Sequence, residues 1–332
     1  MIGVIITTLE CNLSCRYCYE HSEPCRARMP RVAVNNAFTD NFAACEEYIS
    51  CLSELARKNG RTVQIILHGG EPLLIAPNNL ENLFAWIHRN SDAAIQVQTN
   101  GTLITQRIAD LFHQYDVGVV VSMDGPPSIH DEYRKNAGGF GTYNMVMRAI
   151  DLLRNNDVDV SALTTVTELA VNRAREIYTF FSQLGVDFSV NRCFPVHGMQ
   201  GGISNHAYQT FLSDLFDLYC PVDSTHHGIK IPCFDRCIHD LKWDGTGYFY
   251  DPHISPYVSV FSIPRMTFGF AALGQSNRFN SLPEYRLFSE TIMKENSINP
   301  GIRFEGTLKD AVIRHLCKQQ ENDYMSALTL GV

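Results

Sequence analysis

Six short apolar runs, separated by stretches with helical periodicity, restrict the fold of this 332-residue chain more than any other feature. The runs lie at residues 2–8, 63–68, 95–99, 117–123, 160–166 and 188–191. Several are rich in Val and Ile, which is typical of parallel strands buried on both faces. The stretches between them repeat apolar residues every three or four positions, as amphipathic helices do. The alternation predicts βαβ units on one parallel sheet, and six strands are too few to close an eight-stranded barrel.

Residues suited to chemistry follow the predicted strands at their C-terminal ends. Cysteines follow the first strand, Gly69-Gly70-Glu71-Pro72 follows the second, Thr99-Asn100-Gly101 ends the third and Ser122-Met123-Asp124-Gly125-Pro126 ends the fourth. In α/β folds of this kind, functional sites lie at that edge of the sheet. The sequence therefore predicts one site, built from several strand ends.

Cys11, Cys15 and Cys18 are spaced as C-x3-C-x2-C. Thiolates are the usual ligands of iron–sulfur clusters, and three of them leave one iron of a four-iron cubane open to a small molecule. A zinc site or three unligated cysteines are the alternatives. Structural zinc usually takes four ligands, often as two C-x2-C pairs, which this motif lacks.

The spacing resembles the signature of the radical SAM enzymes, and Tyr17 before the third cysteine also fits that family. The resemblance implies a [4Fe-4S] cluster on Cys11, Cys15 and Cys18 whose open iron chelates S-adenosylmethionine (SAM). Reductive cleavage of SAM then gives a 5′-deoxyadenosyl radical that abstracts hydrogen from a substrate. The implied fold is α/β, a partial (β/α)6 TIM-type barrel.

Gly69, Gly70 and Glu71 resemble the GGEP element that meets the amino group of SAM in this family. Glycines allow backbone carbonyls to approach a ligand closely. Glu71 either contributes to that contact directly or braces the loop. An ordinary strand-to-helix turn is the alternative for the whole element.

The segments around Thr99, Asn100 and Asp124 resemble the branch that contains anaerobic sulfatase maturases and peptide-modifying enzymes. There the residues equivalent to Ser122 and Arg134 help hold the ribose and carboxylate of SAM, and a guanidinium fork suits a carboxylate. Arg134 could instead form a surface ion pair with Asp131 or Glu132, and Asp124 could simply cap its turn.

The second half of the chain, residues 196–332, is expected to form a smaller domain after a radical SAM core at 1–195. The segment 244–251 resembles a degenerate SPASM domain, with Phe249 and Tyr250 where that pattern has Pro and Cys. Asp251 aligns with the aspartate that sulfatase maturases use as a base. An auxiliary cluster is not expected, although Cys220, Cys233 and Cys237 with a fourth ligand are its candidate site.

The charge and composition of the chain restrict which binding partners are expected. The net charge is −8 and no Lys/Arg-rich run occurs, so nucleic acid is not an expected substrate. No signal peptide and no apolar run of membrane-spanning length occurs, which favours a cytoplasmic protein without a membrane partner. The expected partners are a peptide or protein substrate and an electron donor of the flavodoxin or ferredoxin type.

The resemblance favours hydrogen abstraction from a residue of a peptide, giving a crosslink or an epimerised centre in a ribosomal peptide natural product. Formylglycine formation of the sulfatase-maturase type is the alternative. A non-catalytic iron–sulfur carrier or scaffold is an alternative of another class. A carrier would not need the residues that resemble a SAM site.

The cysteine motif predicts the iron content. Wild type reconstituted without oxygen should bind about four irons per chain, whereas two cubanes would require about eight. A variant with Cys11, Cys15 and Cys18 all replaced by Ala should lose this iron. If it kept all its iron and sulfide, the assignment would be wrong. A residual cubane signal would establish an auxiliary cluster.

Overall fold

The computed structural model describes residues 1–18, 34–196, 198–220, 228–240, 242–243, 248–251, 258–262, 267–272, 275–279, 283, 302–305 and 307–330. Six parallel strands form its centre and are neighbours in chain order. They are β1 (Ile2–Thr8), β2 (Gln64–Gly69), β3 (Ala94–Thr99), β4 (Val117–Ser122), β5 (Val160–Val166) and β6 (Phe188–Arg192). The predicted parallel six-stranded sheet is therefore confirmed, with strand ends that differ from the predicted ones by one residue at most.

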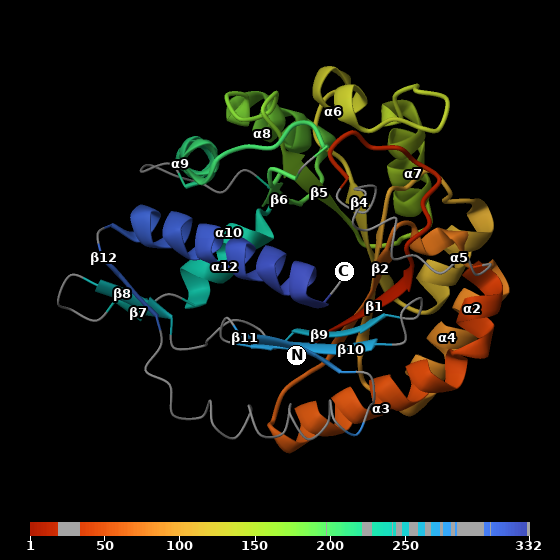
Figure 1. The fold of residues 1–332 in the computed structure, drawn as a ribbon. Helices are drawn as coiled ribbons and strands as arrows, with labels where there is room; N and C mark the ends of the chain where they lie inside the picture. The colour runs from red at the N-terminus through yellow and green to blue at the C-terminus, as the bar shows by residue number, and fades with distance from the viewer. Residues whose placement is uncertain are drawn as a thin grey trace.

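Helices from residues 34–184 surround the sheet in an arc, seen at the bottom, right and top of Figure 1. They are α2 (Val34–Asp40), α3 (Phe42–Lys58), α4 (Pro77–Asn90), α5 (Gln106–Gln114), α6 (Pro127–Tyr133), α7 (Tyr143–Asn155) and α8 (Ala174–Leu184), with a 3-10 turn η2 (Pro72–Leu74) after β2. Ile5, Leu67 and Val97 are fully buried in the core that these helices form with the sheet. Burial of such apolar side chains is the main contribution that stabilises the packing of these helices on the sheet.

The two faces of strands β2 to β6 differ, which corrects the expectation of strands buried on both faces for these five. The second half of β1 is buried on both faces, since adjacent Ile5 and Ile6 are both fully buried. Alternate residues point to opposite faces. One face is buried beneath the helices, as at Ile65, Val119 and Val190. The other carries partly exposed polar side chains such as Gln98 and Ser122. The face of the sheet opposite the helices thus carries polar side chains that could contact a ligand, in addition to those at the strand ends.

Residues after 195 contribute three more strands to the same sheet. β9 (Val258–Ser262) pairs with β1 in parallel, and β10 (Thr267–Ala272) and β11 (Gln275–Phe279) follow in antiparallel order. A separate small sheet contains β7 (Lys242–Trp243), β8 (Tyr248–Asp251) and β12 (Ile302–Glu305). The division at residue 195 stays a prediction, and the described strands on its two sides share one sheet.

The open edge of β6 is covered by a side chain. Gln320 of α12 (Leu308–Leu330) accepts a hydrogen bond from the Arg192 amide at 2.8 Å and donates to the Val190 carbonyl at 2.8 Å. A residue of a parallel neighbouring strand would bond these same two groups. Helix α9 (Asn205–Tyr219) adds the Tyr208 hydroxyl, which accepts from Gln320 and donates to Val190.

Helix α10 (Pro232–Asp240) packs against β6 and α12. Since α12 also contacts β10 and β11, it reaches both ends of the nine-stranded sheet. In the described parts of the chain, no helix is long and apolar enough to cross a membrane.

Replacement of Gln320 by Leu should destabilise the fold by about 1 kcal/mol, because the part-buried Arg192 amide of β6 loses its partner, while the Val190 carbonyl keeps the hydrogen bond from Tyr208. Urea unfolding measures this change. Lys318→Leu alters an exposed residue of the same helix and should change stability by less than about 0.5 kcal/mol. Equal stability of the two variants would show that the amide does not serve as a strand substitute.

Candidate active site

The cysteine loop, residues 11–18, follows β1 and is fixed by two other segments. Backbone N–H groups of Ser14 and Arg16 donate to the carbonyls of Lys135 (2.8 Å) and Tyr133 (2.9 Å). From the other side, the Gln200 amide donates to the Arg16 carbonyl at 3.1 Å. The C-terminal end of α6 and the loop after β6 therefore hold the chain on both sides of the second cysteine, Cys15.

The three thiols fit a cubane better than a single ion. Within the described residues, no three His, Cys, Asp or Glu side chains gather closely enough to hold one metal ion. Thiolates of a cubane bind different irons, so they need not converge on one point. Burial raises the pKa of Cys11 to about 11 and also raises that of Cys15, so both are thiols until a metal binds them.

Gly69 and Gly70 bring the end of β2 against the end of β1 and against Glu10, the residue before the cysteine loop. A Cβ on Gly69 would lie 2.1 Å from the Thr8 carbonyl oxygen, and one on Gly70 would lie 2.2 Å from that of Glu10. Gly69 also has a φ of +132°, which L side chains rarely adopt. Only glycine fits this approach of two backbones at the sheet edge.

Glu71 is positioned to brace this loop. Its fully buried carboxylate accepts from the Leu73 amide (3.0 Å), the Thr99 hydroxyl (2.6 Å) and the Asn100 amide (2.8 Å). Burial raises its pKa, and these hydrogen bonds act in the opposite direction. Of the two roles considered for Glu71, the geometry supports bracing between the ends of β2 and β3.

Asn100 connects the end of β3 to the cysteine loop. Its Nδ2 donates to the Cys11 sulfur at 3.7 Å and to Asn12 Oδ1 at 2.9 Å. Thr102 completes this contact, since its hydroxyl donates to Asn100 and accepts from Asn12. Asn12 was not among the predicted site residues, although its place inside the cysteine motif is a usable signal.

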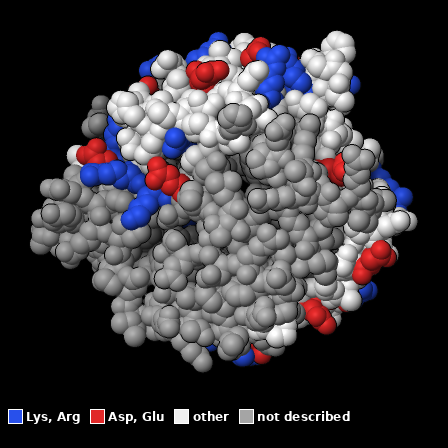
Figure 2. Space-filling model, viewed as in Figure 1, with Lys and Arg blue, Asp and Glu red and all other residues white. Residues whose placement is uncertain are grey.

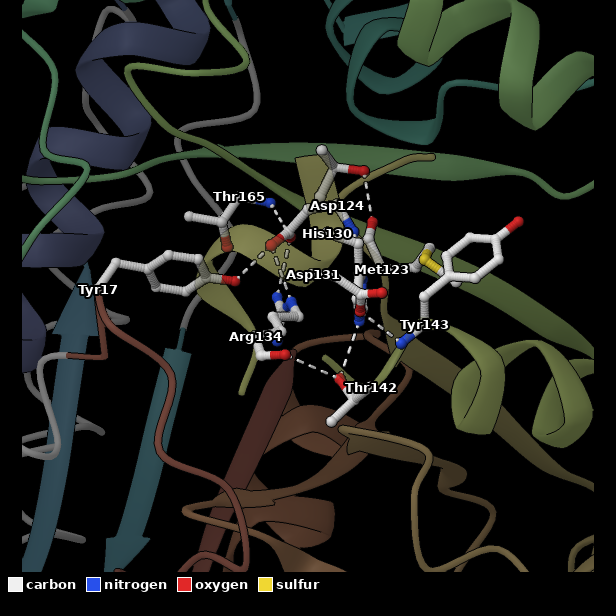
Figure 3. Close-up of polar contacts among 10 residues, drawn as sticks. Tyr17, Met123, Asp124, His130, Asp131, Arg134, Thr142, Tyr143 and Thr165 are labelled. Carbon is white, nitrogen blue, oxygen red and sulfur yellow. Dashed lines mark hydrogen bonds and ion pairs between the residues drawn. The ribbon is translucent and has the colours of Figure 1, made fainter. Parts of the chain in front are cut away.

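Asp124 is the centre of a buried polar network (Figure 3). It accepts from the Tyr17 hydroxyl at 2.7 Å, from Arg134 Nε and Nη2 at 2.9 and 3.1 Å, and from the Thr165 amide at 2.9 Å. Asp124 and Arg134 are only 1% and 7% exposed. The ion pair of Arg134 is therefore with buried Asp124 rather than with Asp131 or Glu132, and Asp124 does more than cap a turn.

His130 supports this network through a hydrogen bond with Asp124 and was not among the predicted site residues. Its Nδ1 accepts from the Asp124 amide at 3.3 Å, so Nε2 carries the proton and donates to Thr142 Oγ1 at 3.0 Å. Thr142 in turn donates to the Arg134 carbonyl. Burial lowers the pKa of His130 to about 4, which keeps the ring neutral near pH 7.

The two remaining predicted site residues, Ser122 and Asp251, lie in different parts of the fold. Ser122 ends β4 and is partly exposed. Asp251 ends β8 opposite Ile302 in the small sheet, which lies at the left of Figure 1, whereas the red loop after β1 passes over the right and upper middle of the picture. The described backbone thus does not bring Asp251 beside the cysteines in this view, and its role as a base stays a prediction.

Cys220 follows α9, while Cys233 and Cys237 lie in α10. Whether they hold an auxiliary cluster likewise stays a prediction. The segment 244–247, which resembles the SPASM pattern, lies outside the described residues.

The open parallel sheet, its surrounding helices and the cysteine loop at the strand ends define a partial α/β barrel with an iron–sulfur motif. A family model of the radical SAM superfamily matches residues 5–176, and the chain belongs to this superfamily. Its members use a [4Fe-4S] cluster and SAM, in agreement with the expected cofactors.

Known proteins similar to this chain include sulfatase maturases. An uncharacterized protein, sll1766 from Synechocystis, is 32% identical over 54% of this chain and 44% of its own length. A cysteine-type anaerobic sulfatase-maturating enzyme from Clostridium perfringens is 26% identical over 70% of this chain and 63% of its own. The chain thus spans less than two thirds of these curated relatives.

Among solved structures, native anSMEcpe with bound AdoMet superposes with a TM-score of 0.59 at 22% identity. The superposition covers 76% of this chain and 74% of that one. This likeness confirms the expected partial (β/α)6 fold, in which the sheet stays open between β6 and β11.

Asp124→Ala should destabilise the chain without cofactors by about 3–5 kcal/mol, because it leaves the Arg134 guanidinium buried without a counter-charge. Urea unfolding of the iron-free chain measures the effect. Glu132→Ala removes the exposed ion pair between Arg16 and Glu132 and should cost less than about 1 kcal/mol. A similar loss in both variants would contradict the central role of Asp124.

His130 should make stability fall in acid. Its pKa lies near 4 in the fold against an ordinary 6.5, so the unfolded chain binds the proton first as pH falls. As the pH falls from 7 to 5, His130 should lower the free energy of unfolding by about 2 kcal/mol. His130→Gln should remove the part of the acid-induced loss of stability that comes from His130. The part that comes from His68, whose pKa burial also lowers to about 4, should remain.

Unfolding midpoints at the two pH values test this dependence on His130. His113→Gln, at an exposed position of α5, should keep the wild-type slope. An unchanged slope in His130→Gln would contradict the neutral buried ring.

Proposed function

We propose that this radical SAM enzyme takes a hydrogen atom from a residue of a peptide or protein substrate. The observation that carries the proposal is the similarity to sulfatase-maturating enzymes. A similar solved structure, anSMEcpe, holds AdoMet together with the Cp18Cys peptide. A cytoplasmic location and reduction by a flavodoxin or ferredoxin belong to the same proposal.

In this proposal Cys11, Cys15 and Cys18 bind the cluster, which together with SAM supplies a carbon radical able to abstract hydrogen. Asn100 orients Cys11 through its contact with the sulfur. Asp124 occupies Nε and Nη2 of Arg134, so Nη1 is left for the carboxylate of SAM. Ser122, at the end of β4, would meet the ribose, and backbone carbonyls of the Gly69–Gly70 loop would meet the amino group.

Two outcomes of hydrogen abstraction are candidates. Formylglycine formation is favoured by the relatives, which include cysteine-type and serine-type maturases. A crosslink or an epimerised centre in a ribosomal peptide is favoured by Tyr250, which stands where the SPASM pattern has a cysteine ligand. Asp251 is the proposed base in the formylglycine reaction, where a carboxylate takes up the proton released on oxidation.

Reconstituted enzyme with a strong reductant should convert SAM to 5′-deoxyadenosine, and Ser122→Ala should slow this reaction while keeping the iron. Liquid chromatography measures the product. If the enzyme binds its full cluster but forms no 5′-deoxyadenosine, the result would favour a non-catalytic iron–sulfur carrier.

The Cp18Cys peptide then separates the two outcomes. Formylglycine gives an aldehyde that a hydrazine reagent traps. An epimerised centre takes up deuterium from D2O without an aldehyde, and a crosslink gives neither signal but links two residues in tandem mass spectra.

A further inference from the structure

Asn100 directs a side-chain N–H group at the sulfur of Cys11. Its Nδ2 lies 3.7 Å from this sulfur, and the backbone nitrogen of Leu13 lies 3.4 Å from the same atom. Asn100 is only 8% exposed, and a donor in such a poorly solvated place interacts strongly with an acceptor that carries charge. The sulfur of one predicted cluster ligand thus receives both a side-chain and a backbone N–H group.

The direction of the Asn100 amide is fixed by a backbone group. The N–H of Thr102 donates to Asn100 Oδ1 at 2.9 Å, and the oxygen is the part of a side-chain amide that can accept such a bond. The nitrogen of the amide must then lie on the other side, toward Cys11. A reversed amide would place its nitrogen against the Thr102 N–H group and its oxygen against the sulfur, so both hydrogen bonds would be lost.

Asn12 and the Thr102 hydroxyl close a ring of hydrogen bonds around this amide. Asn100 Nδ2 donates to Asn12 Oδ1 at 2.9 Å, and Asn12 Nδ2 donates to Thr102 Oγ1 at 2.8 Å. Thr102 Oγ1 donates in turn to Asn100 Oδ1 at 2.7 Å. The donor that faces Cys11 is therefore held in place by the protein itself and does not depend on a cluster for its orientation.

A donor at this sulfur favours the reduced state of the cluster that Cys11 is proposed to bind. Reduction adds one negative charge, and N–H groups directed at the ligand sulfurs stabilise it. Glu71 acts in the opposite sense, since its carboxylate repels negative charge at Cys11. The charged side chains that Figure 2 shows for the described residues lie on the surface, where salt screens their fields. Asn100 is buried and in contact with the sulfur, so its effect is screened far less.

We propose that Asn100 is a positioning residue that raises the reduction potential of the cluster through its hydrogen bond to Cys11. The ring formed with Asn12 and Thr102 keeps the N–H group in that position. The electron comes from an external one-electron reductant, which is oxidised as the cluster is reduced, and no covalent bond forms or breaks. The proposal rests on the cluster assignment made under the proposed function.

Potentiometric titration of the reconstituted enzyme with dithionite and redox dyes, followed by paramagnetic resonance, tests the proposal without SAM. At the midpoint potential of wild type, the ratio of reduced to oxidised cluster in Asn100→Ala should be about tenfold lower, which is about 59 mV for one electron. Thr102→Val should shift the potential in the same direction by less, because the Thr102 backbone N–H still orients the amide. Asn144→Ala, at an exposed position of α7, is the matched control and should equal wild type.

The iron content of each variant separates an effect on potential from an effect on cluster binding. Equal midpoint potentials for Asn100→Ala and wild type at equal iron content would overturn the proposal and make Asn100 a purely structural contact. If Asn100→Ala binds no iron, Thr102→Val decides, and an unshifted potential in that variant would overturn the proposal. Wild type that gives no signal of a reduced cubane would instead overturn the cluster assignment, and the proposal with it.

Discussion

The buried ion pair between Asp124 and Arg134 is the interaction on which the arrangement of the site depends. A charge without a partner in such a place is strongly unfavourable, so the two residues must stay together. Asp124 also accepts from Tyr17 of the cysteine loop and from the β5 backbone at Thr165. One carboxylate therefore fixes the relative positions of three segments that are remote in sequence.

A second carboxylate has the same function on the other side of the cysteine loop. Glu71 joins the ends of β2 and β3, and Asn100 continues this contact to Cys11. The cysteine loop thus lies between two acidic residues whose oxygen atoms are engaged by donors of the protein itself. Glu71 and Asp124, two of the acidic residues expected at the cofactor site, are positioning groups in this geometry.

Local spacing made part of this site predictable. The cysteines, the glycine element and the strand ends are each contained within a few residues, and the alternation of apolar runs located the six strands. The partners of Asp124 were not predictable in the same way, because Tyr17 and Asp124 are 107 positions apart. The pairing of β9 with β1 joins residues near 260 to residues near 4, and no periodicity in a single sequence carries that information. In the glycine-rich connection between α6 and α7, Asn136 Oδ1 accepts from the amides of Gly138 and Phe140, and composition alone does not predict such side-chain hydrogen bonds.

The contact of Gln320 with β6 has a consequence for how this sheet ends. An uncovered edge strand offers its amides and carbonyls to any extended chain and invites self-association. Here one amide side chain imitates the missing neighbour and removes that template at Val190 and Arg192. An extended polypeptide, whether a second copy or a substrate, could add to β6 at these positions only by displacing α12. The sheet is thus limited in width by a helix that was not recognisable as part of it.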